Sequence, residues 1–202
     1  MFLGFDPGGI NRFGVATISG SLVSFRTVSN IKEAMEWSIE SSKGQKPVAA
    51  GIDTILHWST GQSSFRNADI WLRKNYPQMS RSVMAPNSLY GAMTIGGVGL
   101  AIKLREVWPN LLLNETHPKV LYHALTKKSY PRLDLSDAYS WMKSEAKLSF
   151  TGLQPSEDEF DAIISAWATR EAIRLKWKDL TVIDDDHIYP VSDVHYLWPS
   201  LK

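Results

Sequence analysis

The sequence predicts an α/β domain with a mixed five-stranded sheet flanked by helices. The first third of the chain contains three strand-like apolar segments joined by tight turns, which is the pattern of an antiparallel meander. After residue 30, helix-like and strand-like segments alternate, which is the pattern of parallel strands joined by helical crossovers. Together these observations indicate a meander extended by parallel strands.

The strands of the meander are separated by turn residues. The first apolar segment ends at Asp6-Pro7-Gly8-Gly9, and Ser19-Gly20-Ser21 interrupts the alternation between the second and third segments. The predicted strands of the meander cover residues 2–5, 13–18 and 22–28.

Capping residues and apolar spacing predict the elements that follow. Ser29 or Asn30 caps a helix with apolar residues at helical spacing, and Gly44 ends it. Ser156 and Glu159 form a capping box for the last and longest helix. Other helices are expected at about 68–76, 88–108 and 119–125 and from 134 or 136, and other strands at 47–52, 111–113 and 180–183.

The composition is that of an ordinary globular protein. The 202 residues fit one domain, 1–202, with an insertion at about 54–86 and a C-terminal tail at about 179–202. No apolar segment approaches the roughly 18 residues of a membrane-spanning helix, and the opening residues resemble a strand rather than a secretory leader. The chain has no cysteine, which excludes disulfides and thiolate metal sites and fits a reducing compartment. We therefore expect a cytoplasmic protein without a membrane partner.

Three acidic residues lie where predicted strands end. Asp6 follows the first apolar segment, Asp53 ends VAAGID, and Glu115 ends LLLNE. Each also has an ordinary structural interpretation: Asp6 as a turn former, Asp53 as a cap, and Glu115 as the neighbour of a helix cap at Thr116. A carboxylate at the end of a buried strand lies in the crevice above the sheet.

Two more acidic residues belong to the start of the last helix, in SEDEFDAIISAWA. Asp158 and Asp161 are three residues apart, so both project from one face of the helix. Acids at a helix N-terminus also complement the helix dipole. However, Asp161 is flanked by the apolar residues Phe160 and Ala162, which places it near the buried edge of the helix.

The expected topology brings these carboxylates together, because the first, fourth and fifth strands are central and the last helix packs across them. Converging carboxylates repel one another unless a hard cation such as Mg²⁺ or Mn²⁺ joins them. Two such cations roughly 4 Å apart could orient a water and stabilise the attacking and leaving oxygens of a phosphodiester. The expected metal ligands are Asp6, Asp53, Asp158 and Asp161, and Glu115 is a further catalytic candidate.

Basic residues near this crevice are candidate contacts to nucleic acid. Segment 54–86 contains three arginines and one lysine against a single acid. Such cations could contact a phosphate backbone, although solvated surface charge is the commoner explanation. A histidine after the fifth strand could orient a water or a phosphate. The candidates are Arg66, Arg73, Arg81, His117 and Lys119.

The acids follow the order Asp6 on the first strand, Asp53 on the fourth, and Asp158 and Asp161 on the last helix. This order resembles the ribonuclease H-like superfamily, in particular its RuvC-like resolvase branch. The motifs GFDPGG, GID, NETHPKVLYHAL and EDEFDAIISAWATREA look like the predicted nucleases of the four-hundred-twenty-nine domain-of-unknown-function family. The resemblance implies metal-dependent hydrolysis of phosphodiesters in DNA or RNA, including branched forms, and allows a homodimer. Glu115 matches a glutamate-or-histidine motif of that family.

Two other classes of function stay open. The same fold underlies sugar kinases and actin-like ATPases, in which an opening Asp followed by glycines binds phosphate and Mg²⁺; that architecture uses two such domains, whereas this chain has room for one. A non-catalytic nucleic-acid-binding or scaffold protein could also keep the fold. Metal-dependent cleavage favours the enzyme, metal binding without cleavage favours the scaffold, and a nucleotide-dependent thermal shift favours the ATPase.

Overall fold

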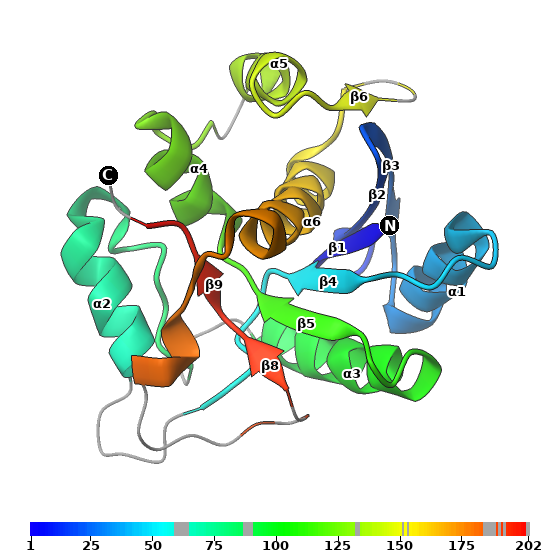
Figure 1. The fold of residues 1–202 in the computed structure, drawn as a ribbon, viewed down its shortest axis with the longest axis horizontal. Helices are drawn as coiled ribbons and strands as arrows, with labels where there is room; N and C mark the ends of the chain where they lie inside the picture. The colour runs from blue at the N-terminus through cyan, green and yellow to red at the C-terminus, as the bar shows by residue number, and fades with distance from the viewer. Residues whose placement is uncertain are drawn as a thin grey trace.

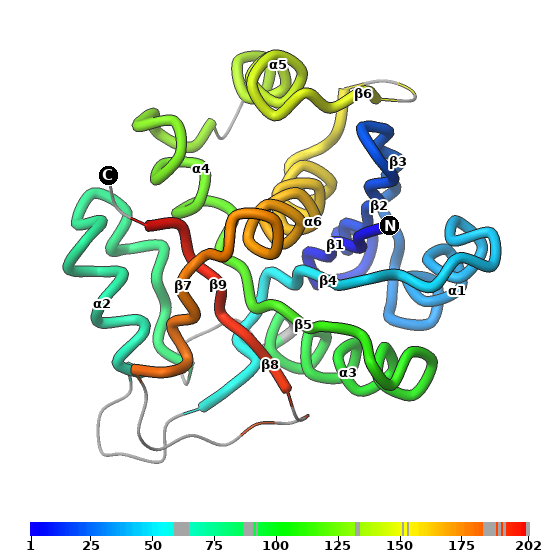
Figure 2. The backbone as a smooth tube through the Cα atoms, in the orientation of Figure 1, coloured from blue at the N-terminus to red at the C-terminus, as the bar shows by residue number. Residues whose placement is uncertain are grey.

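A central sheet with helices on both faces organises the chain (Figure 1). In this computed structural model, the residues described are 1–58, 65–86, 91–131, 134–150, 152, 154–183, 189, 191 and 193–200. The tube view follows the same path and shows the last strands, β8 and β9, lying beside β5 and α2 (Figure 2).

Within the described residues, the main sheet has seven strands in the order β6-β3-β2-β1-β4-β5-β8. β2 is antiparallel to both β1 and β3, whereas β4 is parallel to β1 and β5 is parallel to β4. The predicted α/β class and mixed sheet are confirmed, but the strand count is not, because two-residue strands β6 and β8 extend the edges. The strands are β1 Phe2–Pro7, β2 Phe13–Ser19, β3 Leu22–Val28, β4 Ala49–Ile52, β5 Leu112–Glu115, β6 Ser149–Phe150 and β8 Val194–His195.

The first and last helices begin at the predicted caps. The Asn30 side chain accepts a hydrogen bond from the Glu33 amide, and Ser156 and Glu159 form the expected capping box. No helix among the described residues is long and apolar enough to span a membrane. The helices are α1 Ile31–Ser42, α2 Asn67–Asn75, α3 Gly91–Val107, α4 Pro118–Thr126, α5 Ser136–Ser144 and α6 Glu157–Leu175, with a 3₁₀ turn, η1, at Pro77–Met79.

The strand predicted at residues 180–183 is wrong: Leu180–Ile183 forms a 3₁₀ helix, η3. The Asp179 carboxylate accepts hydrogen bonds from both the amide and the hydroxyl of Thr181, which closes the chain into a turn. The preceding residues form β7, Lys178–Asp179, which pairs with β9, Leu197–Trp198, in a small second sheet.

The two faces of the sheet are covered by different helices. Leu3 and Phe5 of β1 belong to the apolar cluster formed with α1 and α3. Because side chains alternate along a strand, Gly4 faces the opposite side, where α6 crosses the sheet (Figure 1). β1 is therefore buried on both faces, and its C-terminal end lies between α3 and α6.

Helix α6 approaches the sheet closely because glycines lie beneath it. A Cβ atom on Gly4 would lie 2.0 Å from the carbonyl oxygen of Ala162, and one on Gly51 would lie 2.2 Å from that of Ser165. Neither distance is compatible with a side chain, so the two glycines allow the helix backbone to touch the sheet. This contact sets the height of Asp161 above the strand ends.

Candidate metal centre

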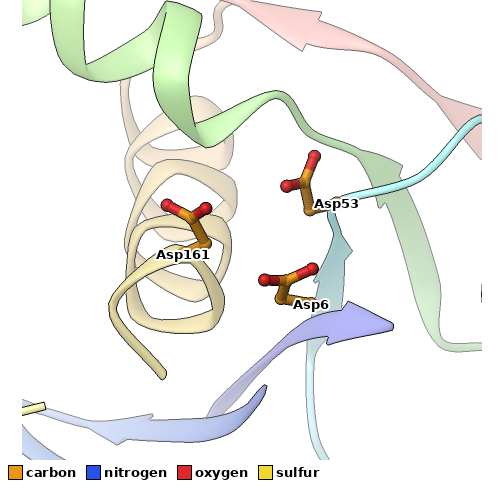
Figure 3. Close-up of side chains that lie close together, drawn as sticks. All are labelled: Asp6, Asp53 and Asp161. Atoms are coloured by element: carbon orange, nitrogen blue, oxygen red, sulfur yellow. The ribbon is translucent and has the colours of Figure 1, made fainter. Parts of the chain in front are cut away.

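Three carboxylates meet at the end of the sheet. Asp6 lies on β1, Asp53 directly follows β4, and Asp161 lies in the second turn of α6. One oxygen from each carboxylate lies within 4.8 Å of the others. Figure 3 shows the three side chains turned toward one another. We call them the carboxylate triad; they are three of the four expected metal ligands.

The register of two parallel strands explains why the triad forms. Gly4 of β1 pairs with Gly51 of β4, and both face α6. Two residues further along each strand come Asp6 and Asp53, which the alternation of side chains places on the same face. The α6 helix that packs on the glycines then presents Asp161 to both. The same small residues that admit the helix therefore bring its carboxylate to the site.

Burial makes the triad electrostatically strained unless it holds a proton or a cation. Asp6 and Asp161 are only 7% and 2% exposed. Burial, and then the neighbouring carboxylates, raise the pKa of Asp6 and that of Asp53 well above their ordinary range. Burial raises the pKa of Asp161 to about 7. Three close carboxylate oxygens are the donor set that hard divalent cations prefer, so these residues fit Mg²⁺ or Mn²⁺.

Two residues contact the carboxylate oxygens of Asp161. The Tyr130 hydroxyl donates a hydrogen bond to Asp161 Oδ1. Lys119 Nζ lies 3.9 Å from Asp161 Oδ2 and 2.9 Å from Glu157 Oε1. Burial opposes the charge of this ammonium, but the carboxylates of Asp161, Glu157 and Asp53 together outweigh burial and raise the pKa of Lys119. Tyr130 was not expected from the sequence, because it lies between helices in a segment without a regular pattern.

Asp158 lies at the rim of the site and not in the triad. Its carboxylate faces Arg12, with 3.3 Å between Arg12 Nη2 and Asp158 Oδ1. It nevertheless lines the same cleft of about 440 Å³ as the three triad residues. The Arg12 side chain is 66% exposed, and exposed ion pairs are weak, so a ligand in the cleft can displace this pair.

Glu115, a catalytic candidate, is paired instead with a buried arginine. Arg66 Nη2 lies 2.6 Å from Glu115 Oε1, and Arg66 Nη1 lies 2.8 Å from Oε2. The other edge of the guanidinium binds Asp69, at 2.7 and 2.9 Å. Burial alone would raise the pKa of Glu115, but Arg66 and His57 together outweigh burial and lower it to about 2. Glu115 therefore stays ionised at neutral pH, and both of its carboxylate oxygens accept hydrogen bonds from Arg66.

The same ion pairs hold Arg66, a candidate contact to nucleic acid, inside the protein. Arg66 is 1% exposed, and both edges of its guanidinium are held by carboxylates. Arg73 is also engaged: its Nη1 donates to the carbonyl oxygens of Ser80 and Val83, at 2.7 and 3.0 Å. Both arginines therefore make hydrogen bonds that stabilise the fold of the segment between residues 66 and 83.

The other three basic candidates line a second cavity, adjacent to the triad: Arg81, His117 and Lys119. Arg81 is exposed, and no carboxylate among the described residues pairs with its guanidinium. Burial lowers the pKa of His117 to about 4, so its ring is neutral near pH 7. These side chains can still meet a ligand.

Comparison with known proteins yields one likeness of structure. No protein-family model matches the chain, and no curated protein matches it. The structure of RuvC from Thermus thermophilus is similar at 14% sequence identity, with a TM-score of 0.48 over 86% of this chain and 95% of that chain.

Proposed function

We propose that the protein is a divalent-metal-dependent nuclease that hydrolyses phosphodiester bonds in DNA or RNA. The observation that supports this most directly is the carboxylate triad, with an oxygen of each residue within 4.8 Å of the others. We further propose that the fold is ribonuclease H-like and RuvC-like, since β1, β2, β3, β4 and β5 have the expected order and directions. Similarity to the four-hundred-twenty-nine family stays a prediction.

In this proposal the residues of the cleft have distinct roles. Asp6, Asp53 and Asp161 would hold Mg²⁺ or Mn²⁺, with Asp158 able to join them from the rim. When bound, the metal would neutralise charge developing on the phosphoryl oxygens and make water more acidic. Lys119, whose side chain is 39% exposed beside Asp161, can donate to a phosphate oxygen.

The ATPase alternative gains no support from the turn after β1. In phosphate-binding loops, successive backbone amides point at the ligand. Here the Gly8 amide donates to the Asp6 carbonyl oxygen at 2.8 Å, and the Arg12 amide donates to that of Gly9 at 3.0 Å. These amides close the turn on itself, so they are not directed at a phosphate.

Cleavage of a panel of nucleic acids tests the proposal. Single-stranded, double-stranded and branched forms of DNA and RNA are incubated with Mg²⁺ or Mn²⁺, and with EDTA as control. We expect metal-dependent cleavage of at least one form. A crystal soaked in Mn²⁺ should show ions about 2.0–2.3 Å from oxygens of Asp6 and Asp161. Binding of Mn²⁺ without cleavage of any form would instead support the scaffold alternative.

Tyr130→Phe should weaken Mn²⁺ binding about 10- to 100-fold, the usual cost of losing a group that orients a metal ligand. The variant removes the hydroxyl that donates to Asp161 and keeps the aromatic ring. Calorimetric titration with Mn²⁺ measures the affinity. Tyr139→Phe, on α5 and packed against Phe150, is the matched control and should bind Mn²⁺ like the wild type. Equal affinities of the two variants would show that Tyr130 does not orient the site.

The stability of the metal-free protein should depend on pH through the triad. Folding raises the pKa of Asp161 from its ordinary value of about 4 to about 7, so the native state keeps a proton that the unfolded chain releases. The free energy of unfolding therefore falls as pH rises across this interval. Because Mn²⁺ binds ionised carboxylates, it should raise the melting temperature more at about pH 8 than at about pH 5.

Other titratable groups also contribute to the pH dependence of the free energy of unfolding, and their contributions differ from that of the triad. His117, with its pKa lowered to about 4, contributes a slope of opposite sign between pH 4 and its ordinary value. Asp161→Asn removes one carboxylate of the triad and leaves His117 in place, so the difference between the two profiles isolates the contribution of Asp161. A Mn²⁺-induced shift of equal size at both pH values would contradict metal binding by these carboxylates.

A further inference from the structure

A second cavity, of about 280 Å³, lies beside the carboxylate cleft. We call it the side cavity. It adjoins the cleft at three residues that line both spaces: Asp53, Met93 and Lys119. Figure 3 shows Asp53, a member of the triad, at the end of its strand. A ligand with one group at the triad can therefore place the next group in the side cavity.

The side cavity is small and combines apolar surfaces with polar edges. Its volume is near the lower limit of small-molecule sites, which span roughly 300–1,000 Å³, so it fits one compact group. The apolar part comes from Ile55, Met84, Met93 and Tyr196, and the polar part from Thr54, Ser82, Thr116 and His117. This combination suits a flat group with apolar faces and hydrogen-bonding edges.

Basic and acidic side chains are equal in number around the side cavity. Three cations line it, namely Arg66, Arg81 and Lys119, and so do three carboxylates, namely Asp53, Asp69 and Glu115. Asp69 and Glu115 are already paired with Arg66. A phosphate would require an excess of cations, whereas a neutral polar group meets no such requirement.

One residue offers a directed hydrogen bond. His117 lines the cavity together with Ser82, whose backbone is a hydrogen-bonding neighbour of the ring. No other hydrogen bond of this ring is found within the described part of the chain, so its second nitrogen can serve a ligand. A nucleobase carries donors and acceptors along its edge, and its faces pack on thioether and aromatic side chains.

We propose that the side cavity receives one unpaired nucleobase of the strand whose adjoining phosphodiester is cut at the triad. The proposal rests on the nuclease function proposed above and adds a substrate class. A base that is stacked and paired in a duplex cannot enter such a cavity without being extruded. The preferred substrate is therefore a strand with an unpaired nucleotide at the cut, either single-stranded or at a branch.

Abasic scanning of a labelled single-stranded oligonucleotide tests this proposal. Each nucleotide in turn is replaced by an abasic residue, binding is measured by fluorescence anisotropy with Ca²⁺, and cleavage is measured with Mn²⁺. We expect one abasic position, next to the cut, to weaken both about ten-fold, within the range for one stacked base. The fully paired duplex should bind at least about ten-fold more weakly than the single strand, because extrusion has an energetic cost.

A variant that fills the side cavity gives a second measurement. Met84→Trp should remove the difference between intact and abasic strands, because the indole occupies the space of the base. Ile70→Trp is the matched control: Ile70 is 48% exposed on α2 and is not part of the cavity lining. Thermal melting establishes that both variants are folded. The scan of the wild-type protein tests the proposal even if Met84→Trp does not fold.

The outcomes separate this proposal from the nuclease proposal. Metal-dependent cleavage with a flat abasic scan overturns the side-cavity proposal and leaves the nuclease function standing. A flat scan with a strong requirement for a 5′-phosphate also overturns it, because the cavity would then bind a terminal phosphate. If the protein neither binds nor cleaves any oligonucleotide, both proposals are overturned.

Discussion

Asp6→Asn is expected to reduce Mn²⁺-dependent cleavage by more than about 100-fold while the protein stays folded. Loss of an outer-shell partner of a metal ligand already costs about 10- to 100-fold, and Asp6 would contact the metal directly. The substitution keeps the size of the side chain and removes its charge from a triad whose oxygens lie within 4.8 Å of one another. Initial rates of cleavage at saturating Mn²⁺ measure the loss.

The melting temperature of this variant provides an independent reading. Burial and neighbouring carboxylates raise the pKa of Asp6, so its ionised form is unfavourable in the metal-free protein. Asp6→Asn should therefore melt at a higher temperature than the metal-free wild type near pH 8 and gain little from Mn²⁺. Asp137→Asn, on the exposed side of α5, is the control and should change neither property. Undiminished cleavage by Asp6→Asn would place the active site elsewhere.

Arg66→Met should destabilise the protein by about 3–5 kcal/mol, the cost of leaving buried charges without their partner. The guanidinium is 1% exposed, and it binds the carboxylates of Asp69 and Glu115, which are each 2% exposed. Methionine fills much of the space but neutralises neither acid. Urea denaturation at neutral pH, followed by fluorescence and by circular dichroism, measures the free energy of unfolding.

Two further variants identify the cause of that loss. Arg81→Met, an exposed position in the same segment, should change stability by no more than about 0.5 kcal/mol. Adding Glu115→Gln to Arg66→Met should restore part of the stability, because one of the two unpaired charges is then absent. If Arg66→Met were as stable as the wild type, the ion pairs would not anchor this segment to β5. The side cavity, which Arg66 also lines, depends on that anchor.

Local patterns in the sequence were enough to predict most of the fold. The caps at Asn30 and Ser156 and the turn after β1 depend on residues only a few positions apart, so their physical basis is visible in the chain itself. The strand at 180–183 was predicted wrongly because Asp179 folds those residues into a turn through its own side chain. Apolar periodicity does not register such a bond.

The candidate site, like the fold, could be predicted from the sequence only in part. Asp6, Asp53 and Glu115 all follow apolar strands, and nothing in the local sequence distinguishes them. In the structure, Asp53 faces the triad and Glu115 faces Arg66, a residue 49 positions away in the chain. Tyr130 is 31 positions from Asp161, whose carboxylate it holds.

The sequence by itself therefore determined most of the elements and which acids stand at their ends, because both depend on short-range spacing and capping. Only the tertiary structure decided which of those acids share a site, which are neutralised, and which cations stay exposed to a ligand. The physical reason is that burial and pairing arise between distant segments. A carboxylate next to an arginine keeps its charge in the core, whereas one surrounded by carboxylates keeps it only with a cation.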